Sequence, residues 1–296
     1  MTSQPAADSR PPLSARPSVW RRVGEALRRR WLWLPIAALV IWTVAPLLIA
    51  ISVSLKERAE VFASPQLIPD SPTMAAYLKT IARPGFRVAF ANSVIVGLGT
   101  LLLTLALTIP SAYVLARFQL RFRHLFLLFI LLPRLVPTLG LMVPLYRLAV
   151  TFGVLDSRLT LIVVLAGTIL PFSIWLMTGF FEQIPVELEE AAAVDGASAW
   201  QRLRRVVLPL AVPALITVGA LAFREAWIEF DLILALTTSA DARTLPYELF
   251  LLSDVTGLPD YPVEAAFAIL TTIPLVLVYL AFERQVIGGL TSGALK

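Results

Sequence analysis

The sequence contains no cysteine and a single histidine, His124. The absence of cysteine excludes disulfide bonds, thiolate catalysis and cysteine-bound zinc, and one histidine is too few for a histidine-rich metal site. No glycine-rich loop ends in Gly-Lys-Ser or Gly-Lys-Thr, which is the motif that cradles nucleotide phosphates. We therefore assign no catalytic residues, no metal ligands and no cofactor to this chain.

Charge is also scarce. Charged residues make up 15% of the chain and hydrophobic residues 58%, with a mean hydropathy of +0.79. A soluble domain has roughly 25% charged and 45–50% apolar residues. Apolar segments that cross hydrocarbon satisfy their backbone hydrogen bonds internally, as helices do. The composition therefore predicts an all-α integral membrane protein in contact with lipid.

Six segments are long and apolar enough to cross a bilayer, which takes about 18 or more such residues. They are residues 32–55, 88–116, 125–146, 159–181, 206–223 and 265–282. Arg134 interrupts the third segment, and the fifth continues through a charged patch to about Ser239. The longest connection, residues 56–87, carries four prolines and is expected to fold over on the outside.

The basic residues orient these spans. With the N-terminus inside, most of the 25 lysines and arginines fall in inside segments, as is typical of cytoplasmic loops. Both termini are therefore predicted to be cytoplasmic. The formal net charge of +5 follows from this topology, so nucleic acid is not needed to explain it.

The chain before the first span divides into two parts. Residues 1–17 are polar and rich in proline, serine and alanine, which predicts disorder. From Ser18, apolar residues recur at three- and four-residue spacing between arginines, which suits either a helix on the membrane surface or a simple basic flank. We thus expect a cytoplasmic N-terminal segment (1–30), a six-span domain (31–286) and a C-terminal tail (287–296).

The segment between the fourth and fifth spans predicts a short cytoplasmic helix. Pro185 suits a first helical turn, and the glutamates that follow it suit a helix N-terminus. Gly196 ends the helix, and Ser198 can cap the next one. The glutamates are Glu187, Glu189 and Glu190. A short helix with a small, alanine-rich face can fit a cleft on a partner.

The same segment resembles a signature of binding-protein-dependent ABC importers. The signature is Glu-Ala-Ala, three residues, Gly, nine residues, Ile, one residue and Leu-Pro. The chain matches it, with valine in place of isoleucine, at Glu190, Ala191, Ala192, Gly196, Val206, Leu208 and Pro209. Other pieces that match in order include Asn92-Ser93, Leu131-Leu132-Pro133 and Thr244-Leu245-Pro246. Within this family the chain is similar to the smaller, six-span, maltose-transporter-like permease of the carbohydrate importers.

This resemblance implies a type I ABC importer permease fold and a bacterial inner-membrane location. It also implies a second homologous permease, two ATPase subunits that bind ATP and Mg, and an extracytoplasmic solute-binding protein. The solute would be a sugar, a polyol or a glycerol phosphate. Residues 186–196 would form a coupling helix in a cleft of one ATPase, and the C-terminal tail would also reach the ATPases. The implied coupling residues are Glu190, Ala191, Ala192, Asp195, Gly196, Leu208 and Pro209.

Charges inside the spans are the candidates for a solute path. Arg134 lies in mid-span, where a charge should face a partner, a cavity or the interface; it is either a pathway residue or an arginine that snorkels near a boundary. Glu225 and Glu229 are four residues apart and are expected to share a helix face, with Trp227 between them and Asp231 beyond. Their carboxylates suit solute hydroxyls, and the alternative is an ion-paired helix end at the outer interface.

Two other functions were weighed. An ion-driven secondary transporter would work without an ATPase but leaves the Glu190–Pro209 spacing unexplained. A membrane-embedded enzyme needs clustered histidine, aspartate or serine residues at one depth, and the sequence offers no such set. The leading interpretation is therefore a non-catalytic import permease.

Overall fold

The computed structural model describes the backbone of residues 19–63, 66–118, 120–254 and 259–292, and the side chains of 33–63, 66–118, 120–252 and 259–283. All regular secondary structure in these residues is helical, which confirms the all-α prediction. The predicted disorder of residues 1–17 lies outside the described part of the chain.

The first span lies in helix α1 (Val19–Ser54), and the chain up to Ala50 forms a unit of its own. The helix is continuous from Val19, so no break separates the expected surface helix from the span at Trp33–Ser54. Large apolar side chains along this span are mostly exposed. That is the surface expected of a helix whose surroundings are lipid or other spans.

The second unit begins at Ile51 and contains the remaining helices. The connection after the first span folds into α2 (Arg58–Ala63) and α3 (Ala75–Ala82). Helix α3 packs against α14 (Tyr261–Ser292), and the Tyr77 hydroxyl lies 2.7 Å from the Ser54 hydroxyl. This connection is thus folded, as the sequence predicts.

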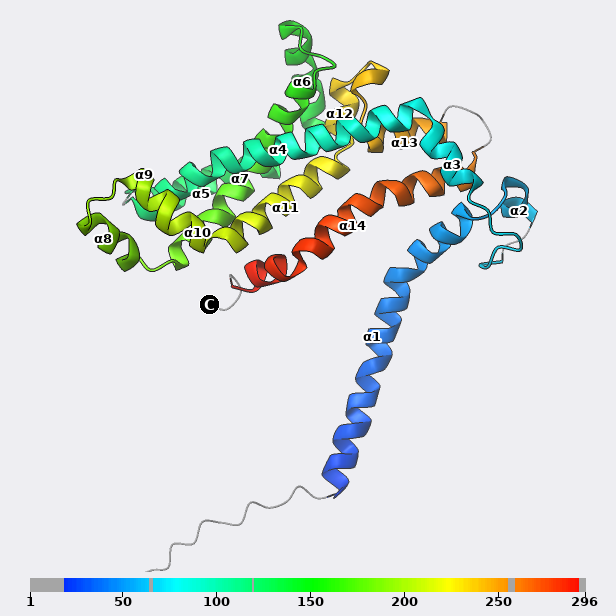
Figure 1. The fold of residues 1–296 in the computed structure, drawn as a ribbon, viewed down its shortest axis with the longest axis horizontal. Helices are drawn as coiled ribbons and strands as arrows, with labels where there is room; N and C mark the ends of the chain where they lie inside the picture. The colour runs from blue at the N-terminus through cyan, green and yellow to red at the C-terminus, as the bar shows by residue number, and fades with distance from the viewer. Residues whose placement is uncertain (1–18, 64–65, 119, 255–258, 293–296) are drawn as a thin grey trace, which may run out of the picture. The chain divides into compact units, whose positions relative to one another are not determined.

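Three long helices form the centre of this unit (Figure 1). Helix α4 (Pro84–Arg117) makes its most extensive contact with α7 (Arg158–Gln183), and α11 (Val212–Ile228) packs against both. Helix α14 lies along α11. Both α4 and α7 have buried residues along most of their length.

Glycines allow α4 to approach its neighbours closely. A Cβ atom at Gly97 would lie 2.8 Å from the Phe223 ring, and one at Gly99 would lie 2.5 Å from the Ile162 side chain. Small residues at helix interfaces permit this kind of backbone approach in membranes. The contact of α4 with α7 and α11 therefore depends on these two positions.

Two of the predicted spans are broken. Four helices among the described residues are long and apolar enough to cross a membrane unaided, and the number of spans is six if each of two bent helix pairs is one span. One pair consists of residues 123–135 and 138–152, bent by 87°, and the other of residues 199–210 and 212–228, bent by 81°. The third and fifth spans are therefore not the continuous helices that the sequence suggests.

Paired prolines explain both breaks. The first pair contains α5 (Arg123–Leu131), the 3₁₀ segment η1 (Leu132–Leu135) and α6 (Thr138–Phe152). Its break lies between Pro133 and Pro137, whose missing N–H groups remove helical hydrogen bonds in consecutive turns. Val136, just before Pro137, is extended at ψ 123°, as a following proline favours.

The second break follows the same rule. After α8 (Glu187–Val194) come α9 (Ala199–Arg202), the π-helical segment η2 (Leu203–Val207) and α10 (Leu208–Leu210). The bend at Ala211 lies between Pro209 and Pro213. Beyond α11, the chain forms α12 (Asp231–Leu236), η3 (Ala240–Ala242) and α13 (Leu245–Asp254).

Different short helices lie at the two ends of the second unit (Figure 1). Helices α8 and α9 lie at one end of α4, and α3 and α13 lie at the other. Helix α6 packs against α12. The bend at residues 136–137 separates α5 and η1 from α6, and the bend at 211 separates α10 from the central helix α11.

Candidate functional site

The predicted short helix between the fourth and fifth spans is α8, with eight residues. It begins after Val186 rather than at Pro185, and its chain reverses at Gly196, where φ is +83°. A left-handed φ suits glycine because other residues meet a steric penalty there. Ser198 caps α9 as predicted, since it accepts a hydrogen bond from the Gln201 N–H and Gln201 Oε1 accepts one from the Ser198 N–H.

The residues of the Glu-Ala-Ala signature lie on the surface. Glu190, Ala191, Asp195 and Gly196 are exposed and Ala192 is half-buried. Between α8 and the next helix lies a notch of about 320 Å³, which Ala192, Asp195 and Gly196 line together with residues 197, 201, 205 and 206. A partner side chain can enter this notch.

The last two signature residues lie at the second break. Leu208 is half-buried against the cluster that includes Phe181 and Val207, whereas Pro209 is exposed. Pro209 has no N–H group to donate to the preceding turn. The π-helical segment ends just before it, and the chain bends at Ala211 just after it. These two residues therefore shape the elbow that joins α8 to the fifth span.

A closed polar cluster joins α8 to the central helices, and we call Tyr113, Arg117 and Glu189 the α8 anchor. Arg117 Nε donates to Glu189 Oε1 at 2.5 Å, and the Tyr113 hydroxyl donates to Glu189 Oε2 at 2.6 Å. Arg117 Nη2 also donates to the carbonyl of Ile184, the residue that ends α7. The side chains of Arg117 and Glu189 are only 12% and 2% exposed.

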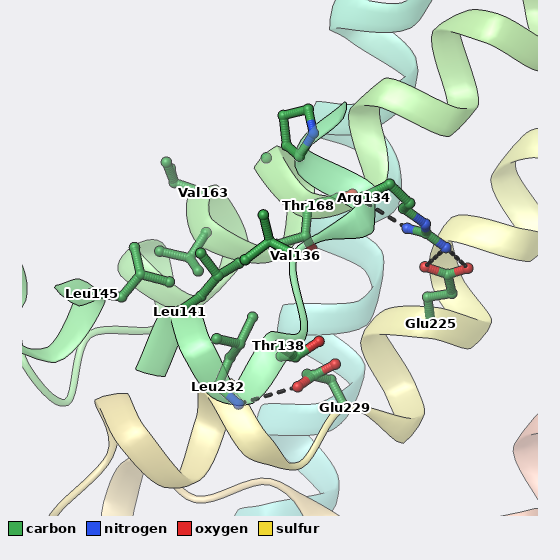
Figure 2. Close-up of a pocket in the computed structure, with 13 residues that line it drawn as sticks. Arg134, Val136, Thr138, Leu141, Leu145, Val163, Thr168, Glu225, Glu229 and Leu232 are labelled. Atoms are coloured by element: carbon green, nitrogen blue, oxygen red, sulfur yellow. Dashed lines mark hydrogen bonds and ion pairs between the residues drawn. The ribbon is translucent and has the colours of Figure 1, made fainter. Parts of the chain in front are cut away.

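A cleft of about 550 Å³ opens beside the first break (Figure 2). That volume lies within the range of roughly 300–1,000 Å³ typical of ligand sites. Segments η1, α6, α7 and α12 and the end of α11 supply its walls. Its lining residues are Pro133, Arg134, Val136, Thr138, Leu141, Leu145, Val163, Val164, Gly167, Thr168, Glu225, Glu229 and Leu232.

Arg134 and Glu225 form an ion pair across this cleft. Arg134 Nη2 donates to both carboxylate oxygens of Glu225, at 2.7 and 2.9 Å, and Nη1 donates to the Thr168 carbonyl at 3.2 Å. The guanidinium also stacks over the Phe172 ring at 5.6 Å. The two side chains are 37% and 29% exposed. Arg134 thus faces Glu225 and lines the cleft, as Figure 2 shows.

Glu229 lines the same cleft but does not share a helix face with Glu225. Helix α11 ends at Ile228, and Glu229 is extended at ψ 130°. Its Oε1 accepts a hydrogen bond from the Leu232 N–H in the first turn of α12. The prediction of a continuous fifth span was therefore wrong here, because Glu229 satisfies a free N–H group at the start of a new helix.

Two further predicted residues lie away from the cleft lining. Trp227 is 1% exposed and packs edge-to-face on Phe90, while its Nε1 donates to the Thr271 carbonyl at 3.1 Å. Asp231 opens α12 and is half-buried. The structure brings Arg134, Glu225 and Glu229 together but places Trp227 in the packed core.

The family of the chain is settled by a match to known sequences. Residues 107–287 match the family described as the binding-protein-dependent transport system inner membrane component. The chain belongs to this family. The match confirms the resemblance seen in residues 190–209, and it covers the α8 anchor, the elbow and the cleft.

The permease also resembles individual proteins over most of its length. It is 34% identical to the sulfoquinovosyl glycerol transport system permease SmoH of Agrobacterium fabrum, over 82% of this chain and 85% of that one. It is 34% identical to the trehalose transport system permease SugB of Mycobacterium tuberculosis, over 91% and 98%. A bacterial ABC transporter structure for import of the acidic polysaccharide alginate matches with TM-score 0.76 at 22% identity, covering 92% and 99%. The last comparison establishes the fold alone.

At the end opposite α8, the permease has a second polar knot, which we call the Asp156 clamp. The Asp156 carboxylate accepts hydrogen bonds from the Thr238 N–H at 2.7 Å, the Thr238 hydroxyl at 2.5 Å and the Ser239 N–H at 2.7 Å. Burial raises the pKa of Asp156, but these hydrogen bonds outweigh it and hold that pKa below its ordinary value. The clamp ties the turn before α7 to the segment after α12.

Sequence reasoning missed both polar knots of the permease. Tyr113 and Arg117 stand four residues apart at the end of an apolar span, which places them on one helix face, but no contact with Glu189 was predicted for them. Asp156 has a positive φ of 58°, the only such non-glycine residue among those described. Aspartate is enriched at this conformation, but the sequence alone does not show which loop it binds.

Proposed function

We propose that the chain is the permease subunit of a bacterial ATP-driven importer for an uncharged sugar or polyol, with both termini in the cytoplasm. It acts with a second permease, two ATPase subunits that bind ATP and Mg, and an external solute-binding protein. Membership of the binding-protein-dependent family supports the importer, and the trehalose permease among its relatives supports a neutral sugar. The sequence lacks a phosphate-binding loop, so hydrolysis falls to the partners.

The observation that carries the proposal is the exposure of the signature residues on α8. Glu190 and Ala191 are exposed beside the notch that Ala192, Asp195 and Gly196 line. Small side chains there let a partner approach the helix backbone, and Glu190 offers a charge to a basic group. We infer that an ATPase subunit seats α8 in a cleft and moves it during the ATP cycle.

Charge reversal on α8 tests the coupling. In membranes carrying the whole transporter, Glu190→Lys or Gly196→Asp should abolish ATP-dependent uptake while the protein still inserts. Ala193→Lys is the matched control, because Ala193 is exposed on the same helix but lies outside the fixed positions of the signature. Normal uptake by both Glu190→Lys and Gly196→Asp would disprove the coupling role of α8.

The charge balance of the cleft supports an uncharged solute. Both carboxylate oxygens of Glu225 accept hydrogen bonds from Arg134. The charge of Glu225 therefore neutralises that arginine, which is the one basic residue of the cleft lining. Glu229 then leaves a net negative charge, which repels anions. Carboxylate and threonine oxygens accept hydrogen bonds from hydroxyls, and Leu141 and Leu145 provide an apolar wall. A neutral sugar or polyol therefore fits this cleft better than a glycerol phosphate.

Substitution at Glu229 tests the solute path. Glu229→Ala should lower uptake without lowering the ATPase activity that the loaded binding protein stimulates. Glu229→Gln keeps an oxygen that can accept the Leu232 N–H and serves as a control for the fold of α12. Unchanged uptake kinetics in Glu229→Ala would remove Glu229 from the path.

A secondary transporter driven by an ion gradient is the alternative, and energy source distinguishes the two. Uptake by the importer should require ATP and the ATPase subunits. Solute uptake by this chain alone, without ATP, would favour the alternative.

A further inference from the structure

Helix α8 is attached to the rest of the protein in an unusual way. Its one buried residue is Glu189, a carboxylate. Surface helices are normally held by an apolar stripe against a core, whereas α8 exposes Leu188 and Val194. The side chain that fixes α8 to the central helices is therefore charged.

The α8 anchor leaves this carboxylate little freedom to rotate. One oxygen of Glu189 accepts from Arg117 at 2.5 Å and the other from Tyr113 at 2.6 Å, and both donors belong to α4. Charge-assisted hydrogen bonds of this length are the strong kind. Arg117 also binds the Ile184 carbonyl, so one guanidinium holds α4, α8 and the end of α7 together.

Stability alone does not explain a buried pair of this kind. Removing two charges from water costs free energy that their attraction often does not recover, and apolar residues of similar volume are frequently as stable. An apolar contact, however, tolerates sliding, whereas two hydrogen bonds, one to each oxygen of the Glu189 carboxylate, fix its position. The anchor therefore provides geometry that an apolar contact would not.

We propose that Arg117 and Glu189 are positioning residues that make α8, α4 and the end of α7 move as one body. A push on α8 then reaches α4 directly through the anchor, and not only along the chain through residues 184–186 and 195–198. Because α4 packs along α7, and α7 carries Gly167 and Thr168 in the cleft wall, the motion reaches the cleft. This inference rests on the proposed coupling role of α8.

The first test compares uptake with ATP hydrolysis in the reconstituted transporter with its partner subunits. Arg117→Gln and Glu189→Gln should each lower uptake about tenfold more than they lower ATP hydrolysis, a loss within the usual range of coupling free energies. Arg123→Gln is the matched control, because Arg123 pairs with Glu182 near the same end of the protein without involving α8. The control should keep the ratio of uptake to hydrolysis.

A cross-link provides a readout that loss of folding would not mimic. The chain has no cysteine, so Arg117→Cys with Glu189→Cys gives one thiol pair in the subunit when the partners are also cysteine-free. Before cross-linking, this variant should hydrolyse ATP with little uptake. A bifunctional thiol reagent long enough to replace the two side chains should restore uptake, because α4 and α8 again move together. Uptake that stays low after complete cross-linking would overturn the proposal.

Failure of this inference can be told from failure of the coupling role. If Glu190→Lys abolishes uptake but Arg117→Gln and Glu189→Gln leave it normal, the role of the anchor is rejected and the coupling role of α8 stands. Normal uptake in all three would reject the coupling role of α8 as well. If both charge variants fail to insert, Tyr113→Phe tests the anchor instead, because it keeps the ion pair but removes one hydrogen bond to Glu189. A ratio of uptake to hydrolysis equal to that of wild type in this variant would count against the anchor.

Discussion

Two of the arginine–glutamate pairs in the permease differ in almost every respect except their chemistry. Arg117 and Glu189 are 12% and 2% exposed, and both oxygens of Glu189 are occupied. Arg134 and Glu225 are 37% and 29% exposed and border a cleft. A buried pair is costly to break because a lone buried charge remains, whereas an exposed pair exchanges partners with water or solute at little cost. The first pair suits a fixed joint and the second suits a site that rearranges.

Removing the glutamate of each pair should give the largest difference in unfolding free energy between the two pairs. Glu189→Ala leaves Arg117 charged and buried, so we expect a loss of about 3–5 kcal/mol in unfolding free energy. Glu225→Ala leaves Arg134 beside an open cleft, and we expect a loss below about 1 kcal/mol. Thermal unfolding of both variants in one detergent checks the ranking, and equal losses would contradict it.

A double replacement sharpens this result. Arg117→Met combined with Glu189→Leu removes both buried charges at once, and such replacements are often neutral or stabilising. We therefore expect an unfolding temperature close to that of wild type. A double variant as unstable as Glu189→Ala would mean that the charges themselves stabilise the fold.

The Arg134–Glu225 pair should control whether the cleft accepts neutral or anionic solutes. Glu225→Gln frees the positive charge of Arg134 in the cleft, so an anionic sugar should compete better for uptake of the neutral solute. We expect a gain of about tenfold in the potency of that competition, equivalent to about 1.4 kcal/mol. Competition assays with a neutral and an acidic sugar of similar size measure it, and Arg224→Gln is a control outside the cleft lining. No change in Glu225→Gln would place solute selection elsewhere.

Loss of the Asp156 clamp should have a small effect on stability, since its carboxylate is bound by neutral donors. Asp156→Asn tolerates the positive φ but loses the charge, and we expect a loss of about 1 kcal/mol in stability. The pKa of Asp156 is lowered by folding, so its contribution is complete above the ordinary value of 3.8 and disappears as pH falls through the folded pKa. Thermal unfolding at neutral pH and in acid should show the two proteins converging in acid; a constant difference would argue against the clamp.

The sequence predicted those features that depend on local pattern. The lengths of the apolar runs predicted the long helices. Gly196 and Ser198 predicted where α8 ends and where the next helix begins. The breaks in the third and fifth spans were not predicted, because a proline does not by itself break a helix. Pro110 and Pro171, for example, lie inside unbroken helices. The breaks occur where two prolines stand four residues apart, so that consecutive turns lose hydrogen bonds.

The site was predicted only in part, since its contacts join distant segments. Arg134 and Glu225 were each recognisable as charges within spans, but their pairing spans 91 residues. Glu189 looked like one of three similar glutamates, and only tertiary packing distinguishes it from exposed Glu190. Trp227 was a candidate for the solute path on chemical grounds, whereas its indole is buried and packs against Phe90.

A distance measurement in two states of the transport cycle tests the central claim most directly. The cysteine-free chain allows spin labels at exposed pairs: Leu107 with Val194 reports on α4 and α8, and Leu135 with Ile228 reports on the cleft. We predict that ATP binding by the assembled transporter leaves the Leu107–Val194 distance distribution unchanged and shifts the Leu135–Ile228 distribution. A shift between α4 and α8 as large as that across the cleft would contradict a fixed joint at Arg117 and Glu189.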